Sequence, residues 1–153
     1  MAPECSVVIP LFNEEDTLPA LHQRLTANMR RLAIPYEIIY VDDGSTDTTA
    51  ATIARFHQED ASTKGVFLSR NFGHQAGLCA GLEAATGRAV ISMDGDLQDP
   101  PEVIPALIDK LRDGYQVVYA RRRRRKLLAP GNRSSPRIQT TRSPDRRARR
   151  RPE

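Results

Sequence analysis

The stretch Ile91-Ser92-Met93-Asp94-Gly95-Asp96-Leu97-Gln98-Asp99-Pro100-Pro101-Glu102 decides how the rest of the chain is interpreted. Residues 88–93 are mostly apolar or small and predict a buried strand, which stops at two aspartates separated by Gly95. Pro100 and Pro101 then favour the start of a helix. Two aspartates at positions i and i+2 after a strand can share one hard cation, and Mg²⁺ takes its remaining ligands from water and phosphates. The pattern predicts a divalent metal site that holds a nucleotide diphosphate.

An Asp-x-Asp pair alone is also typical of a turn whose carboxylates accept backbone amides, so the remaining sequence has to discriminate. Apolar, β-branched runs predict strands at 6–11, 36–41, 66–69, 88–93 and 116–120. Helices are predicted between them: one that follows residues 12–16 and runs to about residue 31, one at 48–59, one rich in small residues that comes with the segment 70–77 and runs to residue 85, and one at 103–112.

Strands that alternate with helices imply right-handed crossovers and a mainly parallel sheet with helices on both faces. Ligands of such α/β folds gather at the carboxyl ends of the strands. A polar cluster follows each predicted strand: Asn13-Glu14, Asp42-Asp43, Arg70-Asn71, Asp94-Gly95-Asp96 and Arg121. Their convergence on one sheet edge favours a binding site over a simple turn.

The charge of the chain is divided between two parts. Residues 121–153 hold 14 of the 23 basic and 2 of the 19 acidic residues, a net charge of +12, which leaves a net charge of −8 for residues 1–120. The sequence therefore predicts a globular domain at 1–125 and a basic, Arg- and Pro-rich disordered tail at 126–153. The two cysteines lack a CxxC or Cys-His pattern and are expected to be reduced and buried.

Four segments resemble family 2 glycosyltransferases, and most of all the transferases that attach sugars to polyprenyl phosphates such as dolichyl and undecaprenyl phosphate. The resemblance covers about residues 4–125 and is carried by Pro10-Leu11-Phe12-Asn13-Glu14, Val41-Asp42-Asp43-Gly44-Ser45-Thr46-Asp47, Arg70-Asn71-Phe72-Gly73-His74-Gln75-Ala76-Gly77 and Met93-Asp94-Gly95-Asp96-Leu97-Gln98-Asp99-Pro100-Pro101-Glu102.

The resemblance implies the nucleotide-sugar-binding fold called GT-A and inverting transfer of a hexose from a UDP- or GDP-sugar to a polyprenyl phosphate. By motif position, the implied nucleoside pocket is lined by Pro10, Phe12, Glu14, Val41 and Asp43. The implied Mg²⁺ or Mn²⁺ ligands are Asp94, Asp96 and Gln98, with Gly95 against the diphosphate. Arg121 would face the diphosphate or the acceptor phosphate.

These residue types suit the implied chemistry. A cation and an arginine stabilise the leaving diphosphate as its charge develops. The acceptor phosphate is already anionic, so the reaction needs no strong general base, and Asp96 is given an electrostatic, metal-bridging role. Other interpretations stay open: Glu14 as a charge in the first helical turn, Asp47 as an Asx or capping residue, and His74 as a structural or exposed residue.

The chain departs from the family after about residue 126, where relatives continue with an interfacial helix and often transmembrane helices. The ending resembles translation in a wrong reading frame of a GC-rich gene. It would leave a donor-binding half with impaired turnover, without a transmembrane segment, where full-length relatives work at the cytoplasmic face of the cell membrane and feed cell-envelope glycan synthesis. Alternatives are a module attracted by charge to a membrane surface and a nucleotidyltransferase, against which the lack of a glycine-rich loop counts. Specific nucleic-acid binding is not expected, because the tail lacks aromatic residues.

Overall fold

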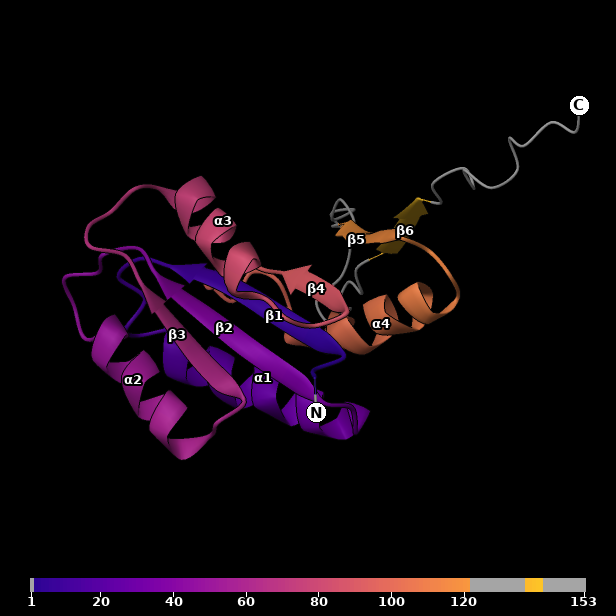
Figure 1. Cartoon of the computed structure of the whole chain (residues 1–153), viewed down its shortest axis with the longest axis horizontal. Helices are drawn as coiled ribbons and strands as arrows, with labels where there is room; N and C mark the ends of the chain where they lie inside the picture. The colour runs from indigo at the N-terminus through magenta and orange to yellow at the C-terminus, as the bar shows by residue number, and fades with distance from the viewer. Residues whose placement is uncertain (1, 122–136, 142–153) are drawn as a thin grey trace, which may run out of the picture. The chain divides into compact units, whose positions relative to one another are not determined.

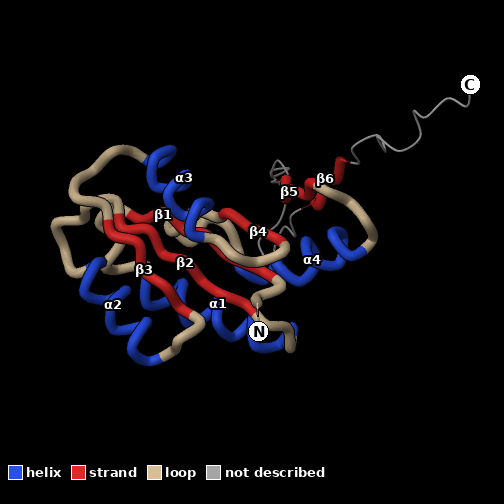
Figure 2. Tube along the Cα trace, viewed as in Figure 1, coloured by secondary structure: helices blue, strands red, loops and turns tan. Residues whose placement is uncertain are grey.

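The computed structural model describes residues 2–121 and 137–141. The chain divides into two compact units, Met1–Glu102 and Val103–Glu153. In the first unit, strands and helices alternate along the chain (Figures 1 and 2). Its elements are β1 (Cys5–Leu11), α1 (Leu18–Leu32), β2 (Tyr36–Asp42), α2 (Thr49–Glu59), β3 (Thr63–Phe67), α3 (His74–Ala84) and β4 (Ala89–Ser92).

The four strands of this unit form one parallel sheet in the order β3-β2-β1-β4. All seven residues of β1 are buried, as are the last six of β2. Continuous apolar burial is typical of central parallel strands that are covered on both faces. The predicted α/β architecture with a mainly parallel sheet is therefore confirmed.

Helices cover both faces of the sheet, with α1 and α2 on one face and α3 on the other (Figure 1). On the first face, the ring of Tyr40 lies 6.4 Å from that of Phe56 in α2, and its hydroxyl lies 3.0 Å from Nδ1 of His22 in α1. On the second face, α3 sits close to the strands because it presents glycines to them: a Cβ at Gly81 would lie 2.3 Å from Cγ1 of Val8. The small residues of α3 therefore allow the helix to approach the sheet closely.

The second unit holds α4 (Ile104–Arg112), β5 (Val117–Arg121) and β6 (Arg137–Thr141), and the 3₁₀ turn η1 spans Pro101–Val103. The sequence places its fifth strand with the parallel sheet, and this expectation is wrong, because β5 pairs antiparallel with β6 in a separate two-stranded sheet. Residues 126–153 are expected to lack packed structure. Only residues 137–141 of that stretch are described, as β6, and the others lie outside the described residues. The division at 125/126 stays a prediction.

One boundary and one side chain differ from expectation. β3 begins at Thr63 rather than Val66. α1 begins at Leu18, after residues 12–16 as expected, so the acidic residues before it belong to the loop. Cys5 is buried as predicted, whereas Cys79 is exposed. None of the helices in the described part of the chain is both long and apolar enough to span a bilayer.

A buried carboxylate ties the amino ends of the strands together. Glu37 of β2 accepts hydrogen bonds from Oγ of Ser6 in β1 and from the backbone N–H and hydroxyl of Thr86, and it pairs with Lys64 of β3. Burial alone would raise the pKa of Glu37, but these four donors outweigh it and lower the pKa to about 2. The charged form of Glu37 therefore stabilises the folded sheet.

Glu37→Gln should lower the free energy of unfolding by about 3 kcal/mol at neutral pH, because the variant keeps the shape and loses the charge. The folded pKa of about 2 lies below the ordinary 4.5, so the stabilisation is complete above pH 4.5 and is lost as the pH falls toward 2. Urea unfolding at several pH values measures this, with Glu59→Gln, at a 62% exposed side chain, as the control. A difference between wild type and Glu37→Gln that does not shrink in acid would contradict this account.

Candidate functional site

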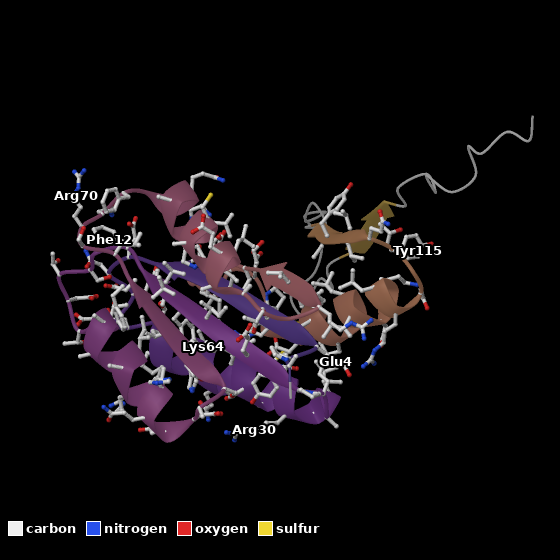
Figure 3. All side chains as sticks on the ribbon, viewed as in Figure 1. Glu4, Phe12, Arg30, Lys64, Arg70 and Tyr115 are labelled. Atoms are coloured by element: carbon white, nitrogen blue, oxygen red, sulfur yellow. The ribbon has the colours of Figure 1, made fainter. Side chains whose placement is uncertain are left out.

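The loops that follow β1, β2 and β4 start at the same end of the sheet. Leu11 lies opposite Asp42 and Val8 opposite Ser92 in the strand register. The backbone N–H of Asp43 donates to the carbonyl of Leu11 at 2.9 Å, which extends the β1–β2 pairing to the first loop residue. In Figure 3, Phe12 and Arg70 lie at this end of the sheet and Glu4, which precedes β1, lies at the other.

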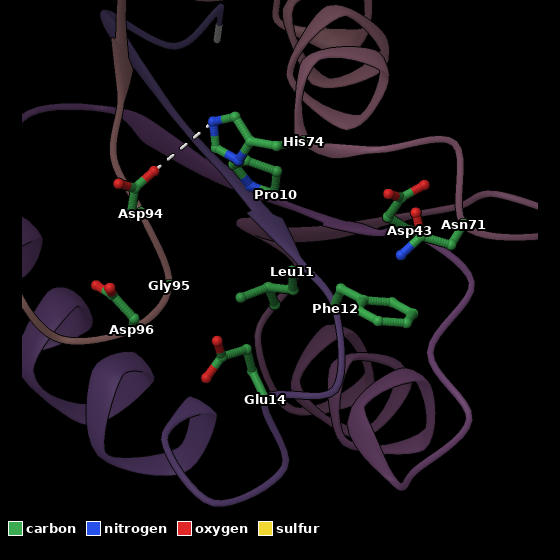
Figure 4. Close-up of a pocket in the computed structure, with 10 residues that line it drawn as sticks. All are labelled: Pro10, Leu11, Phe12, Glu14, Asp43, Asn71, His74, Asp94, Gly95 and Asp96. Atoms are coloured by element: carbon green, nitrogen blue, oxygen red, sulfur yellow. Dashed lines mark ion pairs between the residues drawn. The ribbon is translucent and has the colours of Figure 1, made fainter.

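A pocket of about 340 Å³ opens at this end, within the first unit (Figure 4). The size falls in the range of small-molecule sites. Its lining combines one aromatic ring, one amide, one imidazole and four carboxylates with apolar and backbone surface. The lining residues are Pro10, Leu11, Phe12, Glu14, Asp43, Asn71, His74, Asp94, Gly95 and Asp96.

The loop after β4 brings Asp94 and Asp96 to the pocket. Oδ1 of Asp94 lies 3.8 Å from Nε2 of His74, with both side chains more than half exposed. Oδ1 of Asp96 accepts the backbone N–H of Gln98 at 3.0 Å, which is the turn that the sequence offers as the alternative to a metal site. Asp96 makes this turn and also lines the pocket, so the two interpretations are compatible. Gly95 lets the loop pass over Leu11, because a Cβ there would lie 2.2 Å from Cδ2 of that leucine.

Asp43 organises the loop between β3 and α3. Its two carboxylate oxygens accept the backbone N–H groups of Phe72 and Gly73, each at 2.8 Å. The neighbouring Gly44 has φ +70°, and a Cβ there would lie 2.3 Å from the backbone carbon of Arg70. These contacts fix the entry to α3, whose first residue is His74. Asp43 thus lines the pocket and also positions the imidazole that faces Asp94.

The loop before α1 is locked to the loop before α2. The amide of Asn13 donates to Oγ of Ser45 at 2.9 Å, and the amide of Glu14 donates to Oγ1 of Thr49 at 2.9 Å. Asp47 accepts the amide of Thr49, two residues later, at 2.9 Å, so the interpretation of Asp47 as an Asx-turn residue is confirmed. The N-cap position of α2 is Thr48. Glu14 lies before α1 and lines the pocket, so the alternative of a charge in the first helical turn is wrong.

The structure brings together most of the predicted site residues: Pro10, Phe12, Glu14, Asp43, Asp94, Gly95 and Asp96. Val41 is not among the residues that line the pocket. It is fully buried, because strand alternation turns it toward α3, where a Cβ at Gly81 would lie 2.8 Å from its Cγ2. Gln98 is exposed outside the pocket lining, after the turn at Leu97 with φ +61°. Arg121 ends β5 in the second unit, and its side chain lies outside the described part of the chain.

Three lining residues, Leu11, Asn71 and His74, are not among the site residues predicted from the sequence. The sequence leaves the role of His74 open, although the residue belongs to the segment 70–77 that carries the family resemblance. Asn71 belongs to the polar cluster that follows the third predicted strand, so its place in the chain was the available signal. Leu11 is 2% exposed, and its place in an apolar run is typical of a core residue. No sequence pattern indicates that it lines a pocket.

The side chains of the pocket can hold a divalent cation only when a bound ligand supplies further oxygen atoms. No cluster of three or more His, Cys, Asp or Glu side chains that could hold a metal ion is assembled within residues 2–121 and 137–141. Mg²⁺ usually keeps one or two protein carboxylates and takes other oxygens from water and phosphates. Asp94 and Asp96 supply such carboxylates. An anionic ligand that enters a pocket with four carboxylates needs a cation to offset the repulsion.

Comparisons with known proteins agree with this geometry. The model of the family Glycosyl transferase family 2 matches residues 6–152. An uncharacterised glycosyltransferase of Synechocystis sp. is 51% identical over 125 residues, which are 82% of this chain and 39% of that protein. Undecaprenyl-phosphate 4-deoxy-4-formamido-L-arabinose transferase of Pseudomonas fluorescens is 46% identical over 121 residues, which are 78% of this chain and 36% of that protein.

Among solved structures, the mannosyltransferase PcManGT of Pyrobaculum calidifontis, in complex with GDP-Man and Mn²⁺, is 25% identical with a TM-score of 0.62. The alignment covers 81% of this chain and 36% of that one. The chain therefore spans well under half the length of these relatives. The predicted GT-A type of fold is confirmed for the part that the chain contains.

Asp43→Asn should lower the free energy of unfolding by about 1–3 kcal/mol, because the amide replaces one of the two acceptor oxygens and leaves one backbone N–H unpaired. Hydrogen exchange should speed up at the amides of Phe72 and Gly73. The control is Asp16→Asn, at an exposed loop position. Unchanged exchange at both amides would show that Asp43 does not hold the loop.

Proposed function

Because the chain belongs to glycosyl transferase family 2, we propose that its pocket binds a nucleoside diphosphate sugar together with Mg²⁺ or Mn²⁺. The observation that carries this proposal is the meeting of Phe12, Asp43, Asp94 and Asp96 around one pocket at the carboxyl end of the sheet. Figure 4 shows Phe12, Asp43 and Asn71 on one side and Asp94, Asp96 and His74 on the other.

The two sides of the pocket suit the two halves of such a ligand. Phe12 is 44% exposed, and its ring offers an aromatic face for the base. Asn71 beside it carries a donor and an acceptor for the edge of a base. Asp94 and Asp96 lie on the side of the pocket that would hold the diphosphate and its cation. Pro10 and Glu14 complete the wall between these two sides.

In this proposal the residues act on the leaving group. Asp94 and Asp96 would hold the cation, and Gly95 would leave backbone surface against the phosphates. When bound, the cation would supply Lewis-acid stabilisation of the diphosphate that leaves the sugar. Asp96 contributes charge rather than proton abstraction, because an acceptor phosphate attacks as an anion. An acceptor that attacks from the face opposite the leaving diphosphate inverts the anomeric carbon. Arg121 is proposed to stabilise one of the two phosphates.

We propose a polyprenyl phosphate as the acceptor in the full-length protein, since the Pseudomonas relative is named as an undecaprenyl-phosphate sugar transferase. A hexose is the sugar expected from the sequence. The relatives' names include a derivative of arabinose, which is a pentose, and a mannosyltransferase, whose sugar is a hexose. A lipid acceptor would place the reaction at a membrane surface, and we propose its cytoplasmic face. Because the chain spans 36% of the Pseudomonas relative, donor binding without turnover is the second candidate function.

Calorimetry with UDP-glucose and GDP-mannose tests donor binding. We expect one of them to bind with Mn²⁺ and to lose at least tenfold in affinity when a chelator removes the metal, because the carboxylates then repel the diphosphate. Asp96→Ala should weaken metal-dependent binding to a similar extent. The matched control is Asp109→Ala, at a 69% exposed side chain of α4.

Two outcomes would contradict the proposal. If the sugar nucleotide binds equally tightly in the presence of chelator, no cation takes part in its binding. Salt-sensitive binding to anionic vesicles with no response to either sugar nucleotide would favour the module attracted by charge to membranes.

A further inference from the structure

The imidazole of His74 differs from the other side chains that line the pocket. It is the one nitrogen base among the described residues that line it, and it faces Asp94 rather than the sheet. In Figure 4 the imidazole stands across from Asp94, and the dashed line joins Nε2 to Oδ1. Asp43 fixes the loop that leads into His74 through two hydrogen bonds of 2.8 Å. The imidazole is therefore carried by a well-held backbone.

Fold stability does not account for this placement. The side chain of His74 is 62% exposed and that of Asp94 is 56% exposed, so an ion pair between them contributes little, on the order of 0–1 kcal/mol. In the described part of the chain, the contact with Asp94 is the one interaction recorded for the imidazole. The other histidines differ, because the ring of the partly buried His22 stacks on Phe56 and Nδ1 of His57 lies 2.6 Å from the carbonyl oxygen of Thr63.

The geometry of the pair suits joint ligation of an ion. Two ligand atoms bound to one cation at about 2.1 Å lie about 3 Å apart at a right angle and further apart at wider angles. Nε2 and Oδ1 are 3.8 Å apart, and a small rotation of either exposed side chain closes the difference. We propose that His74 ligates the cation together with Asp94, and that this imidazole makes the site prefer Mn²⁺ to Mg²⁺. Imidazole suits transition metals, whereas Mg²⁺ takes oxygen ligands. The inference rests on the proposed function.

The test uses the full chain labelled with ¹⁵N, bound to Mn²⁺ with UDP or with GDP at natural isotope abundance. Pulsed electron paramagnetic resonance should detect a ¹⁵N coupling to the Mn²⁺ ion, which the nucleotide cannot supply. His74→Ala should abolish the coupling and weaken Mn²⁺ binding about tenfold or more, with Mg²⁺ binding changed less than twofold. The control His57→Gln should leave the coupling and both affinities as they are.

The possible results separate a failure of the proposed function from a failure of the inference about His74. If the wild-type chain binds neither metal with either nucleotide, the proposed function fails together with the inference. If Mn²⁺ binds without a ¹⁵N coupling and His74→Ala leaves the preference between the metals unchanged, the inference alone is overturned. If His74→Ala weakens the binding of Mn²⁺ and Mg²⁺ equally, His74 contacts the phosphates rather than the ion, and the inference is also overturned. Circular dichroism of His74→Ala should match the wild type, because the side chain is exposed.

Discussion

The parallel pairing of β1 with β2 on one edge and with β4 on the other is the constraint on which the site depends. The register sets Leu11 beside Asp42 and Val8 beside Ser92, so the loops after these strands leave the sheet side by side. The amide of Met93 still reaches the carbonyl of Val8 at 3.2 Å, which carries the pairing to the edge of the acidic loop. Because β1 and β2 are almost wholly buried, their register resists slippage. Phe12, Asp43 and Asp94 therefore converge although they are far apart in sequence.

At this edge the protein concentrates negative charge. Asp43 uses both of its carboxylate oxygens to accept amides of the loop before α3, whereas Asp94 and Asp96 are exposed toward the pocket and Asp96 uses Oδ1 for the amide of Gln98. Carboxylate oxygens that stay exposed attract a cation, and a cation in turn attracts phosphate. The fold thus separates a positioning acid from acids that can hold a ligand. At the opposite end of the sheet, the buried Glu37 has its own donors and serves stability alone.

Much of this arrangement could be predicted from the sequence, for identifiable reasons. Apolar runs and glycine or proline boundaries located the elements of the first unit, and parallel topology then placed most polar clusters at one edge. Other features depend on tertiary contacts that a local sequence pattern does not contain. Val41 alternates into the core under α3, and the turn at Leu97 carries Gln98 outside the pocket lining. β5 pairs with β6 outside the parallel sheet, and neither pairing partner nor strand direction is encoded in a short apolar run.

The central claim is that the acidic loop after β4 holds a cation that neutralises the diphosphate of a sugar nucleotide. Anomalous scattering at the manganese edge tests it most directly, with crystals of the protein soaked in Mn²⁺ and UDP or GDP. The account predicts one anomalous peak within about 2.5 Å of a carboxylate oxygen of Asp94 or Asp96, with diphosphate oxygens on its other side. Nucleotide bound in the pocket with no metal at this loop, or manganese bound elsewhere, would contradict it.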